Sequence, residues 1–199
     1  GIRKQAIISS FLLYIGVLFG ILNTYIFVKK GTFLPEEYVL TRLFFDVGQN
    51  FFVLSSLGVI PVIYKFYPYY KDNLPDTKND LMGRAFITAL AGFVFVAIAA
   101  FVFEPLVVRK FGAKSNLFVD YYFWILPFAF GWLLFSLLEA YSWALQKTIF
   151  SNFLKETAVR VITTVFILLY YFRIIGFKHF MMLFSTIYLL AALILLVWL

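Results

Sequence analysis

The chain has no cysteine and one histidine among its 199 residues, and charged residues make up only 14% of it. The missing cysteines exclude disulfide bonds and thiolate metal sites. His179 has no second histidine or cysteine and no nucleophile pattern to pair with, so neither a metal site nor an enzyme is expected. The low charge, combined with 63% hydrophobic residues, excludes a soluble domain of this size.

Long hydrophobic runs dominate the sequence instead. A helix needs about 20 mostly apolar residues to cross a hydrocarbon core of about 30 Å. The runs that meet this requirement are residues 6–28, 39–64, 85–108, 121–145, 153–172 and 180–199. They are continuous rather than alternating, and lipid offers no partner for backbone N–H and C=O groups, so helices are expected rather than β-barrel strands. The predicted fold class is all-α: a polytopic membrane protein in which residues 1–199 form one six-transmembrane-helix bundle.

The connections between these runs carry further expectations. Pro61 and Pro127 lie inside predicted spans and should kink them. Residues 71–83 should form a polar loop with a helix start at Asp80, and the short turn 173–177 should make the last two helices an antiparallel hairpin. The absence of an initial methionine and the end of the chain in a hydrophobic run predict a fragment of a longer protein.

The formal net charge of +7 comes from basic residues in the loops that flank the spans. This placement favours anionic membrane lipids as partners and argues against nucleic acid. Slightly more Lys and Arg residues fall on the side of the N-terminus, so the N-terminus is expected in the cytoplasm.

Polar residues form a stripe on the second predicted helix. At about 100° per residue, Arg42, Asp46, Gln49 and Asn50 cover roughly one-third of its circumference. A carboxylate at the depth of Asp46 costs about 2.5–3.5 kcal/mol, and Arg42, one turn away, is its predicted ion-pair partner. A structural ion pair and a cavity wall both remain open for these two residues, and the continuation through Gln49 and Asn50 favours the cavity.

The fourth and fifth predicted helices carry ionisable residues as well. Glu139 shares a helix face with polar and aromatic neighbours: Ser136, Ser142, Trp143 and Gln146. It is interpreted as a cavity residue, as a protonated carboxyl group or as the partner of a cation on a neighbouring helix. Glu156 and Arg160 are spaced i,i+4, which favours a local helix-stabilising pair near the cytoplasmic surface.

Several short motifs suggest a family. Leu34-Pro35-Glu36-Glu37-Tyr38 begins the second helix, and Ser56-Leu57-Gly58 stands near its end. The stretch from Tyr141 to Lys147, followed by Phe153 to Glu156 and Arg160, links the fourth and fifth helices. This order resembles polysaccharide-exporter flippases, which move O-antigen and capsule repeat units and belong to the multidrug/oligosaccharidyl-lipid/polysaccharide exporter superfamily.

The resemblance implies an N-terminal lobe that works with a C-terminal lobe of the same protein in the cell inner membrane. It implies a lipid-linked oligosaccharide as substrate, alternating access as mechanism, and no cofactor other than a coupling H⁺ or Na⁺. Arg42 and Arg160 would attract the diphosphate, whereas Asp46, Asn50 and Glu139 would bind sugar hydroxyls or carry the coupling ion. The candidate substrate-binding residues are therefore Arg42, Asp46, Gln49, Asn50, Glu139 and Arg160.

Three other functions remain open from the sequence. A multidrug/cation antiporter of the same architecture would need a cavity dominated by acidic and aromatic residues. A membrane-embedded transferase acting on lipid-linked sugars would normally place catalytic residues in sizeable loops, and the loops here are short. A non-transporting membrane scaffold would make no use of the polar stripes.

Overall fold

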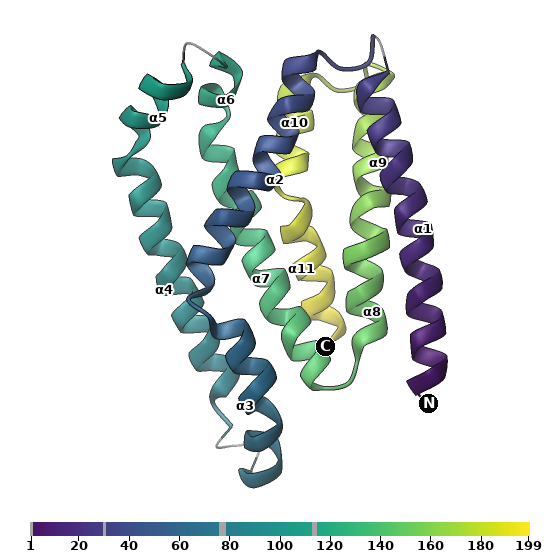
Figure 1. The fold of residues 1–199 in the computed structure, drawn as a ribbon, viewed down its shortest axis with the longest axis vertical. Helices are drawn as coiled ribbons and strands as arrows, with labels where there is room; N and C mark the ends of the chain where they lie inside the picture. Colours follow the sequence, from purple (N-terminus) through teal and green to yellow (C-terminus); the bar gives the residue numbers. More distant parts are fainter. Residues whose placement is uncertain (1, 30, 76–78, 113–114) are drawn as a thin grey trace.

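The computed structural model describes residues 2–29, 31–75, 79–112 and 115–199, with side chains from residue 7 onward in these ranges (Figure 1). Every element in the described ranges is helical. In chain order the elements are α1 (Ile2–Val28), α2 (Pro35–Ser56), α3 (Val59–Asn73), α4 (Leu81–Val102), α5 (Glu104–Phe111), α6 (Asn116–Asp120), the 3₁₀ turn η2 (Tyr122–Trp124), α7 (Ile125–Ala144), α8 (Thr148–Phe153), the π-helical turn η3 (Leu154–Ala158), α9 (Val159–Tyr171), α10 (Phe177–Ser185) and α11 (Ile187–Trp198).

The chain is a multi-pass membrane protein. In the described ranges four helical stretches are long and apolar enough to cross a bilayer, and they are Ile7–Val28, Leu81–Val102, Tyr122–Ala144 and Phe177–Trp198. The bent pair α2–α3 makes a fifth if it is counted as one span. The predicted stretch 153–172 is also helical, but η3 interrupts it, and it carries Lys155, Glu156 and Arg160. The predicted all-α membrane class is confirmed, whereas the count of six spans stays a prediction.

The second helical stretch bends by 47° between α2 and α3. Leu57 and Gly58 have positive φ angles of 46° and 76° there. The kink predicted at Pro61 therefore lies four residues earlier, because proline removes the N–H that would bond the carbonyl of Leu57 and its ring collides with that carbonyl. Pro127 lies in the first turn of α7, and the irregular turn η2 precedes it. N–H groups in a first turn have no acceptor within the helix, so a proline there removes no helical hydrogen bond.

The predicted connections are partly confirmed. The turn between α9 and α10 is short, and the two helices pack against each other as an antiparallel hairpin. Asp80 is the N-cap residue of α4, as predicted, and it forms a 2.7 Å ion pair with Arg84. The predicted loop 71–83 is shorter than expected, because α3 continues to Asn73 and α4 begins at Leu81, while residues 76–78 lie outside the described ranges.

The helices pack as two groups. On one side of the bundle, α1 packs mainly against α8, η3 and α9; on the other, α2 and α3 pack against α4 and α7 (Figure 1). The α10–α11 stretch joins the groups, since α11 packs against α7 and also contacts α9. Aromatic side chains fill the centre, where the fully buried rings of Phe128 and Phe184 stack with centroids 5.7 Å apart. The arrangement leaves α1 and α2 with little mutual contact, and the candidate site lies between these two helices.

Candidate functional site

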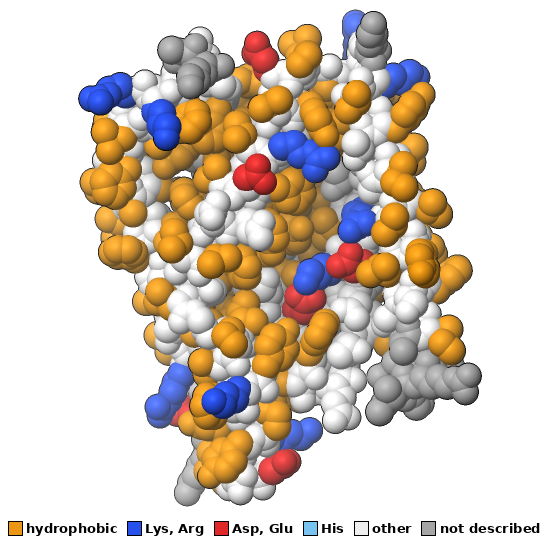
Figure 2. All heavy atoms as spheres, viewed as in Figure 1, with side chains coloured by type: hydrophobic (Ala, Val, Ile, Leu, Met, Phe, Trp, Pro, Cys, Tyr) orange, Lys and Arg blue, Asp and Glu red, His pale blue; other side chains and the backbone are white. Residues whose placement is uncertain are grey.

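A cleft of about 340 Å³ lies between α1 and α2, with α9 and η3 behind α1 and aromatic side chains of α10 and α11 at its floor. In the space-filling view, Lys or Arg side chains and Asp or Glu side chains gather along the hollow between α2 and α1, while hydrophobic side chains cover much of the surrounding surface (Figure 2). The charged lining comprises Arg42 from α2, Lys155 and Glu156 from η3, and Arg160 from α9. The cleft therefore carries three cations and one carboxylate at the depth of membrane helices.

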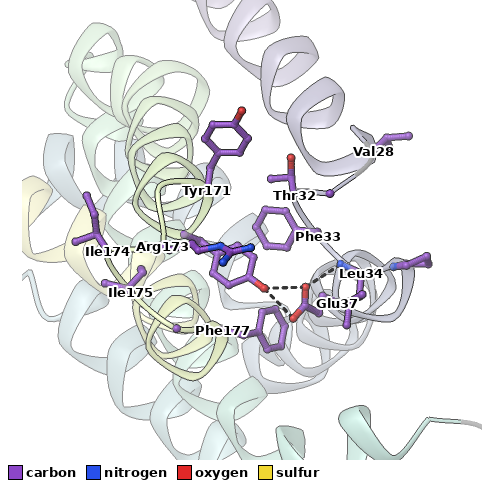
Figure 3. A pocket seen from close by; sticks show the side chains of 14 residues that line it. Val28, Thr32, Phe33, Leu34, Glu37, Tyr171, Arg173, Ile174, Ile175 and Phe177 are labelled. Atoms are coloured by element: carbon purple, nitrogen blue, oxygen red, sulfur yellow. Dashed lines mark hydrogen bonds between the residues drawn. The ribbon is translucent and has the colours of Figure 1, made fainter.

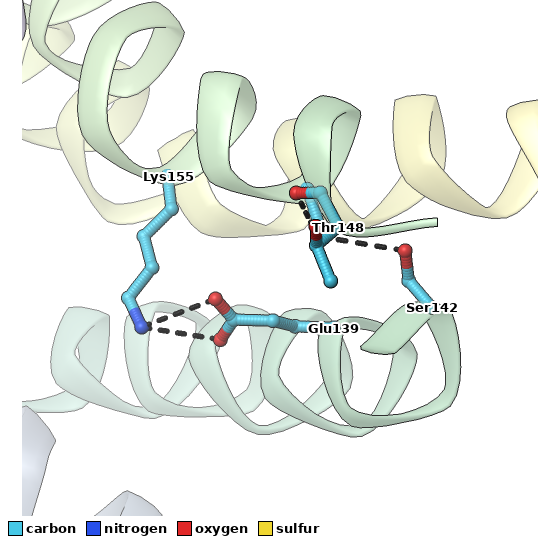
Figure 4. Close-up of polar contacts among 5 residues, drawn as sticks. Glu139, Ser142, Thr148 and Lys155 are labelled. Atoms are coloured by element: carbon cyan, nitrogen blue, oxygen red, sulfur yellow. Dashed lines mark hydrogen bonds and ion pairs between the residues drawn. The ribbon is translucent and has the colours of Figure 1, made fainter. Parts of the chain in front are cut away.

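Two of these cations are paired with carboxylates. The Lys155 ammonium lies 3.2 Å from both carboxylate oxygens of Glu139 on α7 (Figure 4). Glu139 is almost fully buried, with 8% of its side chain exposed against 44% for Lys155. Arg160 Nη2 lies 3.1 Å from a Glu156 oxygen. The sequence prediction of a Glu156–Arg160 pair is confirmed, and for Glu139 the alternative of a cation on a neighbouring helix is confirmed.

Arg42 has a different environment from the one predicted. Its Nε and Nη2 donate hydrogen bonds of 3.0 and 2.8 Å to the hydroxyl oxygen of Tyr38, one turn earlier on α2. The predicted Arg42–Asp46 ion pair is wrong: no such pair forms between these two described residues. Helical side chains lean toward the N-terminus, so an arginine that precedes its acid at i,i+4 leans away from it. Glu156 precedes Arg160, which is the favourable order, and that pair forms.

The remaining residues of the predicted stripe lie outside the cleft lining. Asp46, Gln49 and Asn50 are exposed on α2, and the Asn50 amide donates a 2.8 Å bond to the Asp46 carbonyl oxygen. Glu139 is also absent from the lining and reaches the cleft only through Lys155. The structure thus brings Arg42 and Arg160 together in one cleft, and it leaves the other candidate residues at its margin or on the exposed surface.

The polar face predicted on the fourth span is divided in two. Ser136, Glu139 and Ser142 are buried, whereas Trp143 and Gln146 are exposed. The Ser142 hydroxyl donates to the Lys147 carbonyl oxygen. The Ser151 hydroxyl oxygen lies 3.4 Å from that of Ser142, and the Ser151 hydroxyl donates to the Thr148 carbonyl oxygen at 3.1 Å (Figure 4). These bonds hold the short connection between α7 and α8. Their role is structural.

The π-helical turn η3 places the charged residues of the fifth stretch. Its wider turn brings the consecutive residues Lys155 and Glu156 to the same cleft. The turn packs directly against α1: a Cβ atom at Gly16 would overlap the Glu156 carbonyl oxygen, so only glycine allows this approach. The Thr157 hydroxyl donates a 2.7 Å bond to the Leu12 carbonyl oxygen. This contact was not predicted from the sequence, although the small residue Gly16 was a visible signal for close helix packing.

Further hydrogen bonds tie α1 to α9 beside the cleft. The Asn23 amide donates a 3.0 Å bond to the Arg160 carbonyl oxygen, and the Thr164 hydroxyl donates a 2.6 Å bond to the Asn23 side-chain oxygen. Gly20 leaves room for the Arg160 guanidinium, whose Nη1 would lie 3.3 Å from a Cβ at that position. The backbone that carries Arg160 is therefore held in place by α1.

A larger cavity of about 790 Å³ lies at one end of the bundle, between the α1–α2 and α9–α10 connections (Figure 3). The Tyr170 hydroxyl lies 3.0 and 3.1 Å from the two Glu37 carboxylate oxygens, and the Leu34 N–H donates a 2.9 Å bond to the same carboxylate. The L-P-E-E-Y motif thus starts α2 with a capping interaction and fastens it to α9. Glu37 is engaged in this way, and among the described residues the lining of this cavity supplies one cation, Arg173, against three in the charged cleft. The charged cleft is therefore the better candidate site.

Comparisons with protein families, with curated proteins and with solved structures found no match to this chain.

Proposed function

We propose that the chain is one lobe of a membrane flippase that moves a lipid-linked oligosaccharide across the cytoplasmic membrane by alternating access. The observation that carries the proposal is the cleft between α1 and α2, where three cations face a space open to a ligand inside an otherwise apolar bundle. The family resemblance of the sequence motifs supports the same assignment.

The charges extend along the bundle rather than sitting at one end. By helical rise, Arg42 lies about 10 Å from the start of α2, and Arg160 lies about 16 Å from the end of α9. Both of these helix ends lie at the end of the bundle that carries the α1–α2 and α9–α10 connections. Glu139, which holds Lys155, lies about 8 Å from the opposite end of α7. Each such group costs about 2.5–3.5 kcal/mol at mid-membrane, so a series of them favours a functional pathway. A diphosphate-sugar headgroup could exchange its hydration for these groups while its lipid tail stays in the bilayer.

The full proposal includes six spans, with α2–α3 and α8–η3–α9 each crossing the membrane, and a cytoplasmic N-terminus. It also includes a second lobe in the same protein, because alternating access requires another bundle to move against this one. A H⁺ or Na⁺ ion would couple transport to an ion gradient.

The sign of the cleft charge separates this proposal from a multidrug/cation antiporter. The three cations of the lining face two carboxylates, Glu156 in the lining and Glu139 paired with Lys155, so one positive charge remains in excess. This excess favours an anionic ligand over a cationic drug. An excess of carboxylates would have favoured the antiporter.

The test is reconstitution of the intact protein in vesicles with a fluorescent undecaprenyl-diphosphate-linked saccharide, whose accessibility to a membrane-impermeant quencher reports translocation. Arg42→Gln and Arg160→Gln should each reduce the translocation rate at least ten-fold, because each removes a charge-assisted contact of about 1.5–3 kcal/mol. Arg109→Gln changes an exposed residue on α5 and should leave the rate unchanged. Translocation that is equal in all four proteins, or absent from the wild type, would overturn the proposal.

A further inference from the structure

The hydrogen-bonding capacity of Tyr38 points to a role beyond holding Arg42. A phenol oxygen has two lone pairs and carries one hydrogen. The Arg42 Nε–H and Nη2–H groups donate to this oxygen at 3.0 and 2.8 Å, and together they occupy both lone pairs. The hydroxyl hydrogen must therefore point away from Arg42, toward another acceptor.

The residues that the structure describes do not supply that acceptor. Across the described ranges, the Tyr38 hydroxyl donates to no side chain or carbonyl. The threonine hydroxyls in the cleft are different, since Thr41 donates to the Tyr38 carbonyl oxygen at 2.7 Å and Thr163 donates to the Val159 carbonyl oxygen at 2.8 Å. Tyr38 lines the cleft beside them, so its hydrogen is a donor available to a ligand.

The position of Tyr38 is well fixed. Its ring packs against Phe27 with centroids 5.4 Å apart, and the Arg42 guanidinium carbon lies 5.2 Å from the ring centroid. The bonds from a cation polarise the hydroxyl group and strengthen it as a donor. Arg42 uses two of its five N–H groups on Tyr38 and keeps the others for a ligand. The two side chains thus present donors from one rigid unit.

The charges of the cleft indicate what this unit binds. Lys155 and Arg160 already have carboxylate partners, whereas Arg42 has none among the described residues. We propose that Tyr38 and Arg42 together form a binding site for one oxyanion, either the carboxylate of an acidic sugar or the phosphate of the lipid carrier. The identity of these two ligands rests on the proposed function, but the oxyanion site does not.

The site can be tested by calorimetric titration of the purified intact protein in neutral phosphatidylcholine nanodiscs. Methyl glucuronide probes the carboxylate and farnesyl phosphate probes the phosphate, with methyl glucoside and farnesol as uncharged counterparts. Tyr38→Phe keeps the ring and removes the hydroxyl group, and Arg42→Lys keeps the charge without the two-point contact. Tyr14→Phe makes the same chemical change at an exposed position of α1 outside the cleft.

We expect at least one anionic probe to bind more tightly than its uncharged counterpart. Tyr38→Phe should weaken that binding about ten-fold, the size of one hydrogen bond to a charged group, and Arg42→Lys should weaken it by a similar factor. Tyr14→Phe should match the wild type. Preference for the glucuronide would assign the site to the glycan, and preference for farnesyl phosphate would assign it to the carrier.

The inference is overturned if neither anion binds, if Tyr38→Phe binds as the wild type does, or if Tyr14→Phe loses as much affinity as Tyr38→Phe. Near-identical circular dichroism and gel-filtration profiles would show that the variants are folded. The proposed flippase function fails separately: if vesicles show no translocation while Tyr38-dependent binding persists, the oxyanion site stands and the flippase does not.

Discussion

Replacing Lys155 and Glu139 one at a time should have unequal effects on stability, although the two residues form one ion pair. Lys155→Met leaves the Glu139 carboxylate, only 8% exposed, without its cation. Breaking a fully buried pair in this way costs about 3–5 kcal/mol. Because Lys155 is 44% exposed and solvent already screens the pair, we discount this figure by about half and expect a loss of about 2 kcal/mol.

Glu139→Gln should be less harmful. The Lys155 ammonium is on a flexible stem at the cleft surface and can turn toward water when its partner is neutral, so the expected loss is below about 1 kcal/mol. The double variant Glu139→Gln/Lys155→Met leaves no unpaired charge and should be more stable than Lys155→Met alone. The changes in unfolding free energy of the two single variants and the double variant, each relative to the wild type, form a double-mutant cycle that isolates the coupling between the side chains.

The assay is unfolding of the purified protein in mixed micelles with increasing sodium dodecyl sulfate, followed by tryptophan fluorescence. Lys178→Met, at an exposed position near the start of α10, controls for the loss of a surface lysine and should be close to neutral. Equal destabilisation by Glu139→Gln and Lys155→Met would contradict an unpaired buried carboxylate as the cause of the loss. A double variant that shows the sum of the two single losses would show that the residues are not coupled, which would contradict the ion pair.

Three further substitutions test the packing in the same unfolding assay. Gly16→Ala should destabilise the protein by about 2 kcal/mol, because the new Cβ would overlap the Glu156 carbonyl oxygen, whereas Gly83→Ala, with open space around it in α4, should stabilise by about 0.5–1 kcal/mol. Equal effects of these two changes would contradict the close α1–η3 contact. Tyr170→Phe should cost about 1–2 kcal/mol, because it removes the hydroxyl donor to the partly buried Glu37 carboxylate, and a neutral result would show that this bond contributes nothing.

The membrane class and the approximate positions of four apolar helical stretches could be predicted from hydrophobic run length alone. A continuous apolar run in lipid has to satisfy its own backbone, so its helical state needs no tertiary information. The bend at Leu57 was predictable in principle, because a proline acts on the residue four positions earlier, but the kink was expected at Pro61 itself. The local Glu156–Arg160 pair was predictable because both partners lie on one helix in the favourable order.

The rest of the candidate site depends on contacts between helices. Sequence spacing placed Asp46 next to Arg42, but the lean of helical side chains turned Arg42 toward Tyr38. The partner of Glu139 came from a separate helix, and no periodicity on α7 could have identified Lys155. The π-helical turn η3 has no clear sequence signature, yet it decides which side chains of the fifth stretch face the cleft.

The packing also explains why the cleft lies where it does. The bonds of α1 run to η3 and α9, through Thr157 to Leu12 and through Asn23 to the backbone of Arg160, whereas α2 packs against α4 and α7. The two arginines of the cleft therefore lie in different packing units, Arg42 on α2 and Arg160 on α9, which packs against α1. Polar contacts bridge the units: Lys155 bonds to Glu139 on α7, and Tyr170 on α9 donates to Glu37 on α2. An anion bound between Arg42 and Arg160 would draw the units together, and its release would leave the Lys155–Glu139 and Tyr170–Glu37 bonds as contacts between them. A ligand that binds one spacing of the units more tightly than another shifts the equilibrium between them, which is the physical requirement for alternating access.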